Sequence, residues 1–277
     1  MRDNPMRDDR SPASASTRPR SWGRRVLRWS AAFVILLTLM LLGPLSLMAF
    51  GDDSHRGPWW SASTKTSGSA PDPQTEKTSI VQVYAARTLR WRGHFAVHTW
   101  VATKRANART YTIHHVIGWR YYRGGSPVVT QQGRPDFYWF GSPPDLLLEK
   151  RGPGVEGLID RIEQAVQDYP FADRYAAWPG PNSNTFVAFI SRQVPELALD
   201  LPPTAIGKDF LGDTKIFDTA PSGSGLQLSF YGALGLTAAK AEGLEFNLLG
   251  LSAGVDFDDA ALRLPGLGKV SLTGWLD

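Results

Sequence analysis

Ser183 and a group of histidines are the residues whose types and expected positions could carry out nucleophilic or acid–base chemistry. Ser183 follows Asn182, a favourable N-cap, so the sequence predicts that it lies in the first turn of a helix. The unpaired N–H groups and the dipole at such a helix end stabilise a developing negative charge. His98 lies in the middle of an expected strand and could serve as the base, with His114 or His115 on the next strand orienting it.

A purely structural role explains the same residues. Ser and Asn are common at helix starts because they satisfy the free N–H groups there. The histidines do not predict a metal site: His94 and His98 share one face of the expected strand but lie about 13 Å apart at the strand rise. The chain has no cysteine, which excludes a thiol nucleophile and thiolate zinc. No phosphate-binding glycine motif is present, and we expect no cofactor.

The elements expected to position these residues form an antiparallel sheet packed on two or three helices, an α+β fold. Alternating apolar residues predict strands over 79–87, 93–104 and 110–122, with an edge-like strand over 127–132. An apolar stripe predicts a helix over 155–167, which Pro170 ends. The helix after Asn182 should run to about Val194, with Phe186 and Ile190 on its buried face.

The charge-free run from Trp29 to Phe50 is long and apolar enough to cross a bilayer as a helix. Residues 1–28 hold eight Arg and three Asp, a net charge of +5, so the remaining residues carry about −1 and the chain is basic only through this tail. Positive charge beside a span stays in the cytoplasm, which predicts a single-pass protein of the inner membrane with its main domain in the periplasm. A cleaved signal is the competing interpretation, but L-S-L-M-A-F-G-D-D is a poor cleavage site. No basic patch with interleaved aromatics follows, so nucleic acid is not an expected partner.

Changes in amino-acid composition divide the rest of the chain into three segments. Residues 51–78 are rich in Ser, Thr, Gly and Pro and are expected to form a flexible linker. Residues 79–215 should form the α+β domain. Residues 216–277 contain short apolar strands punctuated by Gly and should form a β-hairpin segment packed on that domain or on a partner.

Three segments, W-P-G-P-N-S-N-T-F-V, P-P-T-A-I-G-K-D and E-G-L-E-F-N-L-L-G-L, resemble an uncharacterised family of bacterial single-span membrane proteins. More distantly, the chain resembles circularly permuted papain-like enzymes of the NlpC type, in which a His strand precedes a helix beginning N-C-x-x-F. That resemblance implies a permuted papain-like fold, with Ser183 in place of the nucleophilic Cys and His98 in place of the base. The loss of the Cys leaves either a weaker nucleophile or a non-catalytic binding cleft.

Two functions follow from these observations. The first is a membrane-anchored periplasmic cleft that binds, and in one version hydrolyses, an amide-containing envelope ligand such as a cell-wall stem peptide. Its catalytic candidates are Ser183, His98 and His115, and its ligand-binding candidates are Asn182, Asn184, Trp178 and Trp100. The second is a non-enzymatic envelope scaffold or assembly factor, whose Gly-rich tail binds another membrane protein.

Overall fold

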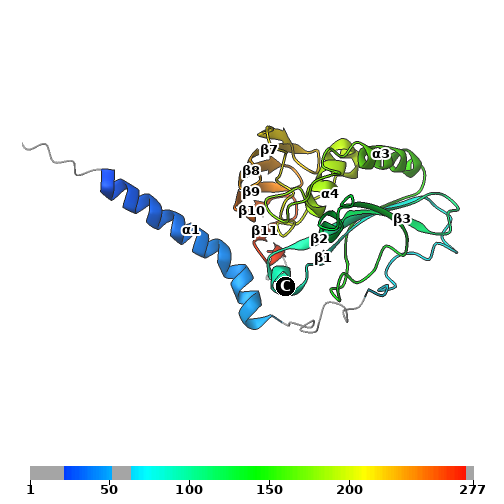
Figure 1. Cartoon of the computed structure of the whole chain (residues 1–277), viewed down its shortest axis with the longest axis horizontal. Helices are drawn as coiled ribbons and strands as arrows, with labels where there is room; N and C mark the ends of the chain where they lie inside the picture. Colours follow the sequence, from blue (N-terminus) through cyan, green and yellow to red (C-terminus); the bar gives the residue numbers. More distant parts are fainter. Residues whose placement is uncertain (1–21, 52–63, 273–277) are drawn as a thin grey trace, which may run out of the picture. The chain divides into compact units, whose positions relative to one another are not determined.

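The computed structural model describes residues 22–51 and 64–272 (Figure 1). The basic N-terminal tail predicted over residues 1–28 therefore lies mostly outside the described residues. The helices are α1 (Trp22–Phe50), α2 (Gly118–Tyr121), α3 (Val155–Gln167) and α4 (Ser183–Gln193), with short 3-10 turns η2 (Arg90–His94) and η3 (Pro195–Leu197). The strands are β1 (Ile80–Arg87), β2 (Val97–Lys104), β3 (Tyr111–Val116), β4 (Val128–Gly133), β5 (Asp145–Arg151), β6 (Phe217–Thr219), β7 (Gly225–Phe230), β8 (Leu234–Ala239), β9 (Gly243–Leu248), β10 (Leu251–Asp256), β11 (Ala261–Leu264) and β12 (Gly268–Ser271).

The α+β prediction is confirmed, with two antiparallel sheets in the described chain. The first sheet has five strands in the order β4-β3-β2-β1-β5. Strands β2 and β3 pair only from Val101 to Thr103 and separate beyond that point. This separation matters because His98 lies on the part of β2 that pairs with β1 but not with β3.

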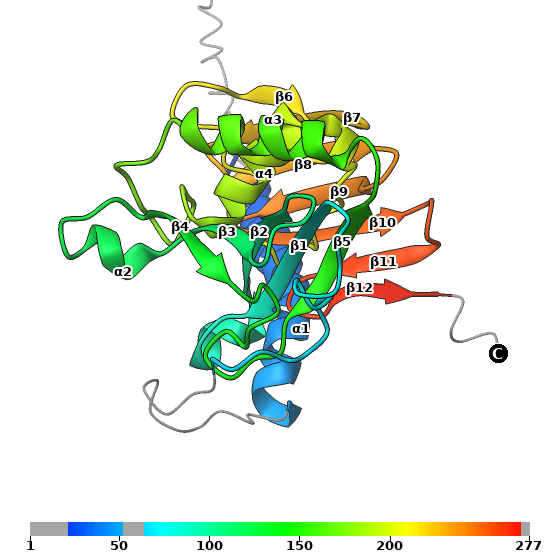
Figure 2. The same ribbon diagram turned by 90° about the vertical axis from the view of Figure 1, so that its right-hand side faces the viewer.

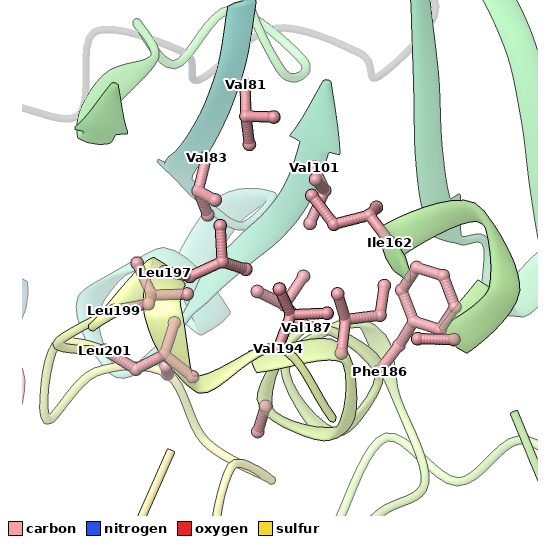
Figure 3. Close-up of a cluster of buried hydrophobic side chains, with 14 of the residues drawn as sticks. Val81, Val83, Val101, Ile162, Phe186, Val187, Val194, Leu197, Leu199 and Leu201 are labelled. Carbon is pink, nitrogen blue, oxygen red and sulfur yellow. The ribbon is translucent and has the colours of Figure 1, made fainter. Parts of the chain in front are cut away.

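Helices α3 and α4 cover one face of the five-stranded sheet (Figure 2). Both helices were predicted from their apolar stripes, and α3 begins and ends at the predicted residues. The core between sheet and helices is formed by valines of β1 and β2, by Ile162 of α3, by Phe186 and Val187 of α4 and by leucines 197, 199 and 201 (Figure 3). On the opposite face, Phe137 and Trp139 cover a second cluster around Trp100.

The second sheet has seven strands, and each strand pairs with its neighbour in the chain, from β6 to β12. Figures 1 and 2 both show its strands following one another as a meander. Side chains from residues 191–209 hydrogen-bond to this sheet and its turns; one example is Arg192, whose Nη2 donates to Gln227 Oε1 of β7.

Helix α1 includes the whole predicted span. It is the one described helix that is long and apolar enough to cross a membrane, a property that an N-terminal signal sequence shares. It ends with a backbone hydrogen bond from Gly51 to Leu47.

Three local details differ from the prediction. Residues 90–94 form a 3-10 turn, so His94 is not on the strand with His98. Residues 118–121 form a helical turn instead of extending β3. The described part of the predicted linker, residues 64–78, is packed on the domain, because the buried Asp136 carboxylate accepts hydrogen bonds from Thr66 and from the Ala70 N–H.

Candidate functional site

The first turn of α4 is held by a capping box. The Asn182 side-chain oxygen accepts from the backbone N–H groups of Asn184 (2.9 Å) and Thr185 (3.1 Å). The Thr185 hydroxyl accepts in return from the Asn182 N–H over 3.2 Å. In this first turn, the backbone N–H of Ser183 has no hydrogen-bond acceptor among the described residues, whereas those of Asn184 and Thr185 do. Asn182 therefore acts as the N-cap that the sequence predicted.

The amide groups of Asn182 and Asn184 tie this helix end to its surroundings. Asn182 Nδ2 donates to the carbonyls of Ala177 and Ile206, both at 3.0 Å. Asn184 Nδ2 donates to Val97 at 3.0 Å and to Ile206 at 2.8 Å. Both amides thus use their two N–H bonds within the protein, so neither is free to donate to a ligand.

A glycine makes this arrangement possible. Gly207 has φ +102°, and a Cβ there would lie 2.3 Å from Asn182 Nδ2. Only glycine tolerates both the backbone conformation and the approach of the amide.

His98 and His115 form a buried pair on the face of the sheet opposite α4. His98 Nε2 lies 3.3 Å from His115 Nδ1. The His98 ring stacks on Trp139 with centroids 3.8 Å apart and an interplanar angle of 8°. Trp139 in turn stacks on Trp119 of α2. Aromatic rings therefore cover the pair on this face of the sheet.

Burial keeps these imidazoles neutral. Burial lowers the pKa of His98 well below its ordinary value, and the neighbouring His115 lowers it further. Burial also lowers the pKa of His115 to about 4, with a further lowering from His114. Among the described residues neither the fully buried His115 Nε2 nor His98 Nδ1 has a hydrogen-bond partner, and only His98 Nδ1 is not sealed from solvent. A neutral His98 can accept a proton or a hydrogen bond through Nδ1.

His114 lies on the other face of β3, toward α3 and α4. Its Nδ1 lies 2.9 Å from the Thr130 hydroxyl, and burial lowers its pKa to about 4 against the opposing effect of Glu163. Of the two histidines that the sequence left open, the structure therefore pairs His115 with His98.

A cavity of about 1150 Å³ brings most of the candidates together. His98, His115, Asn182, Ser183 and Asn184 line it. Ten aromatic residues also line it, namely Trp91, Phe95, Trp119, Tyr122, Phe137, Tyr138, Trp139, Phe140, Tyr175 and Trp178. Three arginines and no carboxylate complete its charged lining among the described residues. Such a surface suits a ligand that offers flat or apolar groups together with negative charge.

Ser183 and His98 line the same cavity without contacting each other through a hydrogen bond. The Ser183 hydroxyl has no partner among the described residues and is not sealed from solvent. Between the two residues lies Thr99, whose hydroxyl points toward α4 and donates to Asn184 Oδ1 (2.9 Å), with the Ser183 carbonyl 3.2 Å away. Because neighbouring residues of a strand point to opposite faces, His98 points away from α4. The catalytic pairing of Ser183 with His98 stays a prediction.

The two candidate tryptophans differ in position. Trp178 lines the cavity and is about half exposed. Trp100 is fully buried below Phe137, donates its indole N–H to the Pro135 carbonyl over 2.8 Å, and does not line the cavity.

Sequence reasoning missed the residues that enclose the histidine pair. Trp139 belongs to F-Y-W-F, a run of four aromatic residues at positions 137–140. That run was the available signal, because four successive rings cannot all be buried in one sheet face and some of them must cover another surface.

Comparison with known proteins gives one match. Neither the curated proteins nor the solved structures contain a match to this chain. Residues 78–210 match a family described as Protein of unknown function (DUF3750). The matched region runs from the residue before Ser79 through Phe210, and so covers the five-stranded sheet, α3, α4 and the candidate site but not the seven-stranded sheet. The candidate site thus lies in a DUF3750 domain, which fits an uncharacterised family.

Proposed function

We propose that this protein is a membrane-anchored envelope protein whose aromatic cavity binds an amide-containing ligand, with a peptidoglycan stem peptide as the class that fits best. In this proposal α1 remains as an inner-membrane anchor and the DUF3750 domain works in the periplasm. The observation that carries the proposal is the cavity itself, where the Ser183 hydroxyl and His98 Nδ1, neither of which has a partner among the described residues, lie among aromatic rings.

The polar groups of the cavity complement a peptide. The Ser183 hydroxyl and N–H can donate to a ligand carbonyl at the positive end of the α4 dipole. His98 Nδ1 can accept from a ligand amide N–H. The exposed Arg92 and Arg123 lie on the cavity lining and attract carboxylates, which stem peptides carry. Trp119 and Trp178 offer flat surfaces to sugar or aliphatic groups.

Binding is a better-supported function than hydrolysis. A serine nucleophile needs a base within hydrogen-bond reach, and the described structure has none at Ser183. The neutral His98 could reach a ligand but is directed to the opposite face of the sheet from α4. The permuted papain-like relationship would place both groups on one ligand, and it remains part of the proposal, not of the observed fold.

Calorimetric titration of the full chain in detergent with a soluble disaccharide–tetrapeptide tests the proposal. We expect saturable binding that Ala177→Trp weakens at least tenfold, because Ala177 is exposed on the cavity lining and an indole there would occupy ligand volume. Ala172→Trp is the matched control, since Ala172 is exposed but does not line the cavity. No binding by the wild type, or equal weakening by both variants, would refute a ligand site in this cavity.

A further inference from the structure

The seven-stranded sheet has a polar buried face and an apolar exposed face, the reverse of an ordinary antiparallel sheet. Side chains that face the rest of the domain are polar and buried, as in Gln227, Glu245 and Arg263. Side chains that face outward are apolar and exposed, as in Leu226 (53 % exposed) and Leu244 (49 %). Antiparallel sheets normally place the apolar face inward and the polar face in water.

The buried polar face is held by a paired ionic network, so its orientation is well determined. Lys208 lies 3.0 Å from Asp209 and also contacts Glu245. Arg263 Nε donates to Glu245 over 2.8 Å, and its Nη1 donates to Asp200 over 2.7 Å. Turning the sheet over would separate Glu245 and Arg263 from Lys208 and Asp200 and would place apolar side chains against the buried charges that remain, which is unfavourable.

The outward positions form continuous apolar rows across the strands. One row runs through Phe217, Leu228, Leu236, Phe246 and Ala253, since each of these residues is the register partner of the next. A second row runs through Leu226, Ala238, Leu244, Val255, Leu262 and Val270. None of the outward positions of β6–β12 in the described chain carries a charged side chain. Monomeric soluble proteins rarely expose a contiguous apolar surface of this kind.

The β11–β12 turn of this sheet contacts the C-terminal part of α1, which belongs to the same compact unit. In the compact unit from Leu39 onward, a Cβ on Gly43 would lie 2.1 Å from the Pro265 carbonyl, and one on Gly266 would lie 2.7 Å from Pro44 N. Gly43 is seven residues before Phe50, which is about 10 Å along a helix. The turn between β11 and β12 therefore contacts α1 within the charge-free run that ends at Phe50.

We propose that the outward face of the seven-stranded sheet lies on the lipid bilayer that α1 crosses, as a second membrane contact of the domain. If Phe50 marks the end of the span, the β11–β12 turn lies at the depth of the upper acyl chains, a depth typical of proteins that bind one leaflet. A bilayer requires only an apolar surface, whereas a protein partner is usually also recognised through polar and charged side chains, and the outward strand positions of β6–β12 carry no charge. The proposal rests on α1 crossing the membrane and is independent of any ligand in the cavity.

Single-cysteine variants of the full chain, reconstituted in vesicles and labelled with a fluorophore, test the proposal because the natural chain has no cysteine. Leu236→Cys and Leu244→Cys report on the outward face. Val34→Cys, exposed on α1, is the positive control, and Ser69→Cys, exposed on the segment before β1, is the negative control. We expect nitroxide groups near the top of the lipid acyl chains to quench the probes at residues 236 and 244 several-fold more than the probe at Ser69.

Each other outcome overturns the proposal. Quenching at residue 34 without quenching at residues 236 and 244 would show an anchored protein whose sheet is away from lipid. Probes at residues 236 and 244 that neither lipid nitroxide nor aqueous iodide can quench would show a face covered by a second copy or another protein. No quenching at residue 34 would remove the anchor on which the proposal rests.

Discussion

Acidification should destabilise this domain through its buried histidines. His114 and His115 are almost completely buried, and burial lowers the pKa of each to about 4. In the unfolded chain each imidazole has its ordinary pKa of about 6.5. Between these two values the unfolded state binds protons that the folded state does not, so the stability contribution present at neutral pH is lost as the pH falls from 6.5 toward 4.

The magnitude follows from the same values. At pH 5 the unfolded imidazole is almost fully charged and the folded one almost fully neutral, so each residue lowers the free energy of unfolding by about 2 kcal/mol relative to pH 7. His114→Asn and His115→Asn remove these titrations, and the Asn side chain can replace the hydrogen bond made by Nδ1. Each variant should therefore lose about 2 kcal/mol less than the wild type between pH 7 and pH 5.

Urea unfolding of the full chain in detergent, followed by tryptophan fluorescence at the two pH values, measures this difference. His94→Asn is the control, because His94 lies half-buried in η2, away from the His98–His115 pair. The comparison within each variant cancels any cost of the substitution itself. If His114→Asn and His115→Asn lose as much stability on acidification as the wild type and the His94→Asn control, the two histidines are not held neutral and the reasoning fails.

Three further predictions concern the core, the ionic network and the topology. Ile162→Asp should lower the melting temperature strongly or prevent folding, because an unpaired carboxylate in this core costs several kcal/mol; a variant that melts like the wild type would contradict the packing of α3. Glu245→Gln removes the buried carboxylate shared by Lys208 and Arg263, which keep Asp209 and Asp200 as partners, and should lower the free energy of unfolding by about 1–3 kcal/mol in urea titration; an unchanged midpoint would show that this carboxylate adds nothing. A reporter that works only outside the cytoplasm should be active when fused after Asp277, and its inactivity in a stable fusion would refute the periplasmic topology.

Local patterns in the sequence predicted the elements around the candidate site. The stripe containing Ile159 and Ile162 predicted α3, and Asn182 followed by an apolar face predicted α4. Both signals are local, since a helix cap and a helical period depend on residues within a few turns. Strand β5 was missed because D-L-L-L-E-K-R has no alternation, and its existence depends on pairing with β1.

Two larger features depend on contacts between distant residues and could not be predicted in this way. Alternation in L-Q-L-S-F shows that one face of β7 is polar but not which face is buried. The polar face is buried here because Asp209, eighteen residues earlier, accepts a hydrogen bond from Gln227. Trp100 shares a strand face with His98, so the sequence suggested a site residue, yet Phe137 covers it. Distant partners decide both outcomes.

Thiol labelling of Ser183→Cys, with and without peptidoglycan fragments, tests the central claim most directly. The Ser183 hydroxyl is open to the cavity, so the introduced thiol should react with a small maleimide, and a saturating disaccharide–tetrapeptide should protect it. The same ligand should leave the labelling of Ser69→Cys unchanged, because Ser69 is exposed and does not line the cavity. Equal labelling rates of Ser183→Cys with and without the ligand would contradict a binding site in this cavity.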